Sequence, residues 1–123
     1  MKLIEIIHLI NGVVCTPEVR LEWDIKGAFG ADLMSDVLAS IQPDAILLTG
    51  LCNPQVVRTA QMADIRAIIL VRGKQPPRET IELAIAENIP IISCPYGMFE
   101  VCGLLYQAGL PSVERNVQSS CLD

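Results

Sequence analysis

Three short segments in the second half of the chain are apolar at almost every position. They are residues 45–49, 67–71 and 90–94. Each is followed by a segment in which apolar residues recur every three or four positions, the spacing of an amphipathic helix. Strands without polar alternation are typical of parallel sheets, whose two faces are both covered. This half of the chain therefore predicts a β-α-β-α-β-α order, wound by right-handed crossovers into a parallel core.

The helices of this half carry start and stop signals. Asn53 is an N-cap residue followed by Pro54 at the first helical position, and Pro77 opens the next helix. The last helix begins at about Met98 and ends at Gly109. The side chains predicted to face the core are Val56, Val57, Ala60, Ala63, Ile81, Ala84, Ile85, Met98, Val101, Cys102 and Leu105.

The first half is less regular. Polar residues recur at Lys2, Glu5 and His8, which predicts a helix over residues 2–11 with one wet stripe. A short strand is predicted at residues 13–15.

Further along, residues 19–25 alternate between apolar and polar side chains, which predicts a strand with one buried face. Residues 26–30 are then the exit from that strand. A helix from about Asp32 is predicted to bury Leu33, Val37 and Ile41.

Taken together, these elements predict a three-layer α/β/α domain with a mainly parallel sheet of four to five strands. We expect residues 1–111 to form this single domain. The chain turns polar after Pro111, so residues 112–123 are expected to be a mobile tail.

Composition narrows the possible partners. The formal net charge is −5 and no basic run occurs, so we expect no binding to nucleic acid. No apolar run approaches the ~18 residues of a membrane span, and the N-terminal residues lack a signal-peptide layout. Five dispersed cysteines then favour a reducing, cytoplasmic location. The apolar fraction of 51% is high for this length, which favours a homodimer that buries part of it.

The candidate binding site lies where the predicted parallel strands end, because ligands of open α/β sheets bind at that edge. Each strand end leads into a helix N-terminus, whose free N–H groups favour an anion, and Arg72 and Lys74 add positive charge. We therefore predict a phosphate or carboxylate site; the alternative is that these residues only solubilise a strand exit and start a helix. The candidate residues are Gly50, Cys52, Asn53, Arg72, Gly73, Lys74 and Tyr96.

Catalytic chemistry finds little support. Neither a P-loop nor a G-x-G-x-x-G fingerprint is present, His8 is the only histidine, and no cysteine pair has metal-site spacing. We expect no cofactor, no metal and no catalytic residue. A thiol-dependent enzyme or redox sensor remains an alternative, because Cys52 and Cys94 lie near predicted helix N-termini, which can lower a thiol pKa.

Five segments together resemble a stand-alone DRTGG-domain protein. They are GADLMSDVL (residues 30–38), LLTGL (47–51), PQVVRTA (54–60), VRGK (71–74) and MFEVCGLLY (98–106). The resemblance implies a fold similar to the N-terminal domain of HPr kinase/phosphorylase, without that protein's catalytic P-loop domain. The Asp-Arg and Thr-Gly-Gly pairs that name the family do not occur here, so the resemblance transfers no ligand residues.

The resemblance also implies a role. Related domains are accessory or dimerising parts of phosphotransacetylases and of pyrophosphatases with CBS pairs, and stand-alone members are often encoded beside iron-only hydrogenase components. The leading hypothesis is therefore a non-catalytic, homo-oligomeric regulatory domain that binds a small anion such as a nucleotide or phosphate. The alternative is a purely structural docking protein for a redox enzyme such as an iron-only hydrogenase.

Overall fold

A five-stranded sheet forms the centre of the molecule. The computed structural model describes residues 1–17, 21–40 and 43–113. The strands are β1 (Val13–Val14), β2 (Gly27–Gly30), β3 (Ala45–Thr49), β4 (Ala67–Leu70) and β5 (Ile91–Ser93). Their order is β1-β5-β4-β3-β2, and every neighbouring pair is parallel except β1 with β5. The prediction of a mainly parallel sheet is confirmed.

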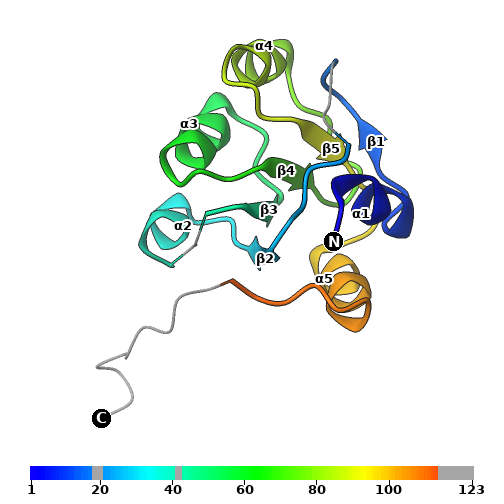
Figure 1. Cartoon of the computed structure of the whole chain (residues 1–123). Helices are drawn as coiled ribbons and strands as arrows, with labels where there is room; N and C mark the ends of the chain where they lie inside the picture. Colours follow the sequence, from blue (N-terminus) through cyan, green and yellow to red (C-terminus); the bar gives the residue numbers. More distant parts are fainter. Residues whose placement is uncertain (18–20, 41–42, 114–123) are drawn as a thin grey trace.

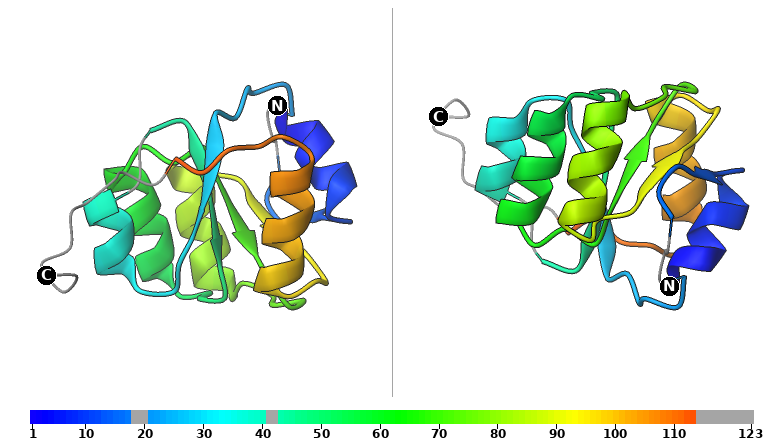
Figure 2. Two further views of the ribbon diagram at one scale, coloured as in Figure 1. Left: turned by 90° about the horizontal axis from the view of Figure 1, so that it is seen from below. Right: turned by 90° about the horizontal axis from the view of Figure 1, so that it is seen from above.

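Helices cover both faces of this sheet (Figures 1 and 2). The helices are α1 (Leu3–Leu9), α2 (Met34–Ser40), α3 (Pro54–Met62), α4 (Arg78–Ala86) and α5 (Met98–Gln107). Helices α2, α3 and α4 lie on one face, and α1 and α5 lie on the other (Figure 1). The predicted three-layer α/β/α architecture is thus confirmed.

The pattern of buried residues explains these layers. Successive side chains of a strand point to opposite faces, so Ile46 and Leu48 of β3 pack with α1 and α5, whereas Ala45 and Leu47 pack with α2 and α3. All five residues of β3 are buried. Because both faces must be apolar, the strand shows no polar alternation in sequence.

The strand predicted over residues 19–25 is wrong for the residues that the structure describes, and residues 19–20 lie outside them. Residues 21–26 instead run past the beginning of α1, where Leu3 and Ile4 donate their N–H groups to the carbonyls of Trp23 and Leu21 (both 2.9 Å). The first N–H groups of a helix lack partners within it, so this segment satisfies them. The actual strand β2 is the glycine-flanked segment that the sequence pattern assigned to an exit.

Other differences are smaller. Helix α2 begins at Met34, and Leu33, predicted to be buried, is 61% exposed; Ile41 lies outside the described residues. Ile85 is also more exposed than predicted, because it lies on the outer side of α4 with 46% of its surface accessible. Val37 of α2 and Ala84 of α4 are buried as predicted.

The end of the described chain runs along β2. The Pro111 carbonyl accepts the Ala28 N–H (3.0 Å), and Val113 donates its N–H to the Ala28 carbonyl (3.3 Å). This segment covers the outer edge of β2, which would otherwise expose unpaired backbone groups. Most of the predicted tail, residues 114–123, lies outside the described residues.

Candidate functional site at the carboxyl edge of the sheet

A tight turn follows β4 at the carboxyl edge of the sheet. Lys74 donates its N–H to the Val71 carbonyl (3.3 Å) across Arg72 and Gly73, which both have positive φ angles (59° and 67°). Two consecutive positive φ values are the signature of a type I′ turn. The Arg72 N–H donates to the Tyr96 carbonyl (2.7 Å) and the Gly73 N–H to the Cys94 carbonyl (2.8 Å). The turn is therefore attached to the exit of β5.

The turn places the Arg72 side chain between the exits of β3 and β5. Its Cγ lies 3.9 Å from the position that a Cβ would occupy at Gly97, the N-cap of α5. Its Nη2 lies 3.1 Å from the corresponding position at Gly50, just after β3. A Cβ at Gly50 would therefore crowd the end of the arginine side chain, whereas one at Gly97 would make an ordinary contact with it.

Asp32 is a residue of this edge that the sequence analysis placed only at the start of a helix. Its Oδ1 accepts hydrogen bonds from the Thr49 hydroxyl (3.0 Å) and the Gly50 N–H (2.8 Å), which links the exits of β2 and β3. The Gly50 N–H is therefore already occupied. An anion at this edge would face Arg72 rather than Gly50. No local sequence signal reveals a contact between residues 18 positions apart.

The helices that begin at this edge lack side-chain caps at their N-termini. Side-chain capping hydrogen bonds are absent at the N-cap residues of α3, α4 and α5, which are Asn53, Pro77 and Gly97. A helix N-terminus carries free N–H groups and a partial positive charge. Arg72 lies against the N-cap of α5, and its guanidinium lies near Gly50, three residues before the N-cap of α3.

The other residues predicted for the binding site differ in exposure and in the contacts that they make. Lys74 and Asn53 are exposed, so their side chains are accessible to a ligand. The Cys52 carbonyl accepts the Thr80 hydroxyl (2.7 Å), which ties α4 to the loop after β3. The Tyr96 hydroxyl accepts a hydrogen bond from the Asn11 amide (2.8 Å) and so is held toward the loop after α1. Tyr96 therefore acts at this edge through its backbone carbonyl.

Three cavities formed by the described residues lie away from this edge. Two of them, of about 300 and 390 Å³, lie at the opposite, amino edge of the strands around Trp23. The third, of about 170 Å³, lies between β2 and α5. None of these three cavities is lined by Arg72.

The Cys94 thiol is fully buried, and burial raises its pKa, with the nearby Glu100 carboxylate adding to the increase and a hydrogen bond from the Tyr96 N–H opposing it. The Sγ atom lies 3.2 Å from the Ile10 carbonyl, to which the thiol donates. A raised pKa disfavours the thiolate, which is the reactive form. This environment argues against Cys94 as a nucleophile.

The raised pKa predicts a pH dependence of stability. The folded state keeps Cys94 protonated, whereas the unfolded thiol ionises above about pH 8.5, so stability is complete below that pH and is lost as pH rises. We expect the urea midpoint to fall between pH 8 and 10, and to fall less in Cys94→Ser, which keeps the hydrogen-bond donor but does not ionise. Equal slopes for the two proteins would contradict this assignment.

A comparison with family models decides the family. The model described as the DRTGG domain matches residues 5–108, which is most of the chain. The chain belongs to the DRTGG family. The resemblance inferred from the sequence is thereby confirmed. No curated protein matches the chain.

This DRTGG domain also resembles a solved structure, described as the CBS and DRTGG domains of the regulatory region of Clostridium perfringens pyrophosphatase complexed with the activator diadenosine tetraphosphate. The TM-score is 0.67 at 20% identity, and the match covers 94% of this chain and 50% of that one. At this identity the likeness shows a shared fold. The chain spans about half of the length of that structure.

Two further observations concern metal binding and membrane crossing by this DRTGG domain. Within the part of the chain that the structure describes, no group of three or more His, Cys, Asp or Glu residues is placed to hold a metal ion. None of the helices in the same ranges combines the length and the apolarity that crossing a bilayer requires.

Proposed function

We propose that this DRTGG domain is a non-catalytic regulatory module that binds a small phosphate-bearing anion at the carboxyl edge of its sheet. The observation that carries this proposal is the Arg72 turn. An arginine holds a left-handed conformation there, and its side chain extends from the N-cap of α5 to Gly50, just after β3. Of the two thiols considered for catalysis, Cys94 is buried with a raised pKa, which disfavours its thiolate.

The energetics of the turn support a role for Arg72. A left-handed backbone costs a residue with a Cβ about 1–2 kcal/mol relative to the right-handed form. Strain of this kind is often found at ligand sites, where the surrounding structure holds it in place. Here the hydrogen bonds to the Tyr96 and Cys94 carbonyls hold it. Among the described residues Arg72 has no ion pair, and an anion would bind it beside the Asp32 carboxylate, whose Oδ1 lies 3.6 Å from the same Cβ position at Gly50.

The solved neighbour supports the class of ligand. Its regulatory region is complexed with diadenosine tetraphosphate, whose polyphosphate chain is an anion that an arginine and helix N-termini bind well. This chain spans half of that structure, so the same activator is a probe here rather than an established ligand.

The test is a calorimetric titration of the intact chain with diadenosine tetraphosphate and with pyrophosphate. Arg72→Asn removes the guanidinium and keeps a residue that tolerates a left-handed backbone. Because a charge-assisted hydrogen bond contributes about 1.5–3 kcal/mol, we expect this variant to bind about 10- to 100-fold more weakly. The matched control is Arg58→Ala, which removes an exposed arginine from α3 and is expected to leave affinity unchanged.

The outcomes separate clearly. Loss of affinity in Arg72→Asn with unchanged affinity in Arg58→Ala supports the carboxyl-edge site. Equal affinity in all three proteins would place the anion elsewhere. Absence of binding by both probes would reject the proposal and favour a docking function.

The second candidate function is association through α5, and an exposed aromatic pair favours it. Phe99 is 82% exposed and Tyr106 is 73% exposed, and their spacing of seven residues places them on one face of the helix. We propose that a second copy of this chain covers this face. The alternative partner for the same face is the redox enzyme that the resemblance implies. Sedimentation should show a dimer that Phe99→Ser weakens, and a monomer at micromolar concentration would reject the homodimer.

A further inference from the structure

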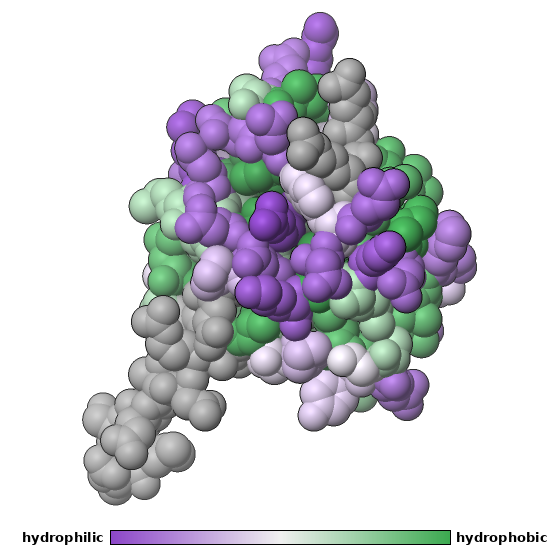
Figure 3. Space-filling model, viewed as in Figure 1, coloured by the Kyte–Doolittle hydropathy of each residue, from purple (hydrophilic) through white to green (hydrophobic). Residues whose placement is uncertain are grey.

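A cleft at the amino edge of the sheet has no role in the proposed function. The cavities of about 300 and 390 Å³ share Trp23, Asn88 and Ile89, so they are two parts of one cleft. Figure 3 shows this side of the molecule, with hydrophilic side chains gathered across its centre. The parallel strands β2 to β5 are only three to five residues long, so the cleft lies roughly 10–17 Å from the carboxyl edge.

Trp23 is held in place at this cleft from two sides. Its carbonyl accepts the Leu3 N–H at the start of α1 (2.9 Å), which fixes the backbone. The Arg66 guanidinium lies 5.3 Å from the centre of the indole ring, a cation–π distance. Arg66 is itself oriented by Asp44, with 3.0 Å between Nη2 and Oδ1. The half-buried indole is therefore a preorganised aromatic wall.

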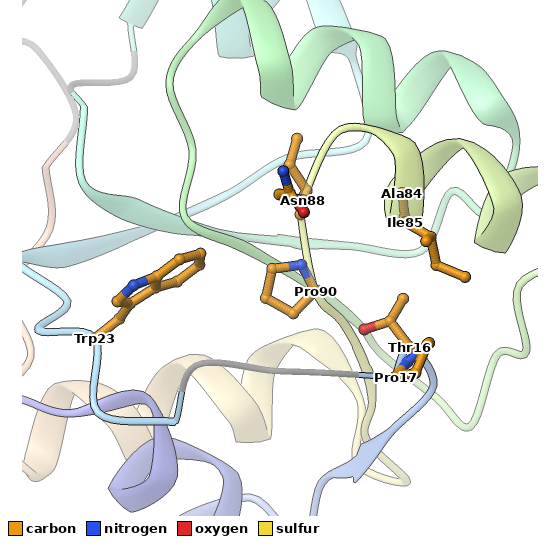
Figure 4. A pocket seen from close by; sticks show the side chains of 8 residues that line it. Thr16, Pro17, Trp23, Ala84, Ile85, Asn88 and Pro90 are labelled. Carbon is orange, nitrogen blue, oxygen red and sulfur yellow. The ribbon is translucent and has the colours of Figure 1, made fainter.

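The opposite walls combine apolar surface with a few polar groups (Figure 4). In Figure 4 the indole lies on one side of the cavity, Thr16 and Pro17 lie on the other, and Pro90 lies between them. Asn88 projects at the rim, and its amide carries both a donor and an acceptor. Among the described residues no hydrogen bond engages this amide, and the residue is exposed.

The charge around the cleft selects against anions. Asp64 and Glu87 line it, and within the described ranges neither has an ion pair, whereas the charge of Asp44 is offset by Arg66 and Lys26. The three carboxylates exceed the two positive charges of Arg66 and Lys26 by one, so a phosphate here would meet a small net negative charge, which repels it. A neutral ring would meet no such barrier, whereas a cationic ring would be repelled by the Arg66 guanidinium beside the indole.

We propose that this amino-edge cleft binds a neutral planar heterocycle of the nucleobase class. The ring stacks against Trp23, and its polar edge forms hydrogen bonds with the Asn88 amide. Base stacking on aromatic side chains tolerates many ring types, and an asparagine amide matches the paired donor and acceptor of a base edge. The site is independent of the anion site at the other edge.

The test uses the fluorescence of Trp23, which is the only tryptophan of the chain. Titration of the intact chain with adenosine should quench this fluorescence saturably, and ATP should bind several-fold more weakly because of its phosphates. Asn88→Gly keeps the left-handed backbone at that position (φ 57°) and removes the amide. We therefore expect the adenosine concentration at half-maximal quenching to rise about tenfold. Asn11→Gly makes the same change at another left-handed asparagine outside the cleft (φ 53°) and should leave the titration unchanged.

Quenching that rises linearly with adenosine, as for free N-acetyltryptophanamide, would overturn the proposal. So would saturable quenching of equal strength in Asn88→Gly, or ATP that binds as tightly as adenosine. Arg72→Asn separates the two proposals, because it should weaken anion binding at the carboxyl edge and leave the adenosine titration unchanged.

Discussion

Ile69→Ala is expected to lower the free energy of unfolding by about 2–5 kcal/mol, the range for truncating a buried isoleucine. Ile69 lies in β4, the middle strand of the five, and none of its surface is exposed. Its side chain packs in the core between the sheet and helices α1 and α5, so the cavity cannot close without moving a helix. For a domain of 123 residues, total stability is on the order of 10 kcal/mol, so the loss is a large share of it.

Urea denaturation measures this effect, and Ile85→Ala is its matched control. The same atoms are removed there from an isoleucine on α4 that is 46% exposed. We expect the control to change stability by less than about 1 kcal/mol, because surface substitutions are usually mild. A loss in Ile69→Ala no greater than in Ile85→Ala would contradict the described core.

Gly27→Ala is expected to destabilise the domain by about 1–3 kcal/mol, although it adds a single methyl group. A Cβ at Gly27 would lie 2.2 Å from Val113 Cγ1 and 2.6 Å from the Pro111 carbonyl oxygen. The second contact is with backbone, which cannot rotate away. The segment over residues 111–113 would have to leave β2, with loss of its hydrogen bonds to Ala28.

Gly103→Ala is the matched control for this prediction. It makes the same substitution in α5, where an added Cβ meets nothing within 4 Å. Because alanine favours a helix over glycine, we expect a gain of about 0.5–1 kcal/mol. The two variants should therefore shift the thermal midpoint in opposite directions. A Gly27→Ala protein as stable as the unmodified chain would show that residues 111–113 do not pack on β2.

Much of the fold could be predicted because its signals are local. Strand β3 and the start of α3 at Pro54 were both predicted at their observed positions. Each has a signal made of neighbouring residues, an apolar run for the strand and an Asn-Pro pair for the helix. The segment around Trp23 was predicted wrongly as a strand. Its alternation arises because one side faces α1, whose first N–H groups it satisfies, and no sheet neighbour is involved.

The candidate site could be predicted in position but not in geometry. The order of strands and helices was enough to bring the Arg72 turn, Gly50 and Tyr96 to one edge. The left-handed conformation of Arg72 could not be predicted, because arginine has no preference for it and the hydrogen bonds to β5 impose it. The Asp32 contact with Gly50 and the Trp23 cleft were missed for a related reason, since both depend on residues far apart in sequence.

The central claim is that an anion binds beside Arg72, and backbone amide NMR of the labelled chain titrated with pyrophosphate tests it most directly. We predict saturable shifts at Arg72, Gly73 and the first-turn amides of α3 and α5, with Trp23 and Asn88 unchanged at the opposite edge. Shifts confined to the Trp23 cleft, or no saturable shift at Arg72, would contradict the assignment of the carboxyl edge as the anion site.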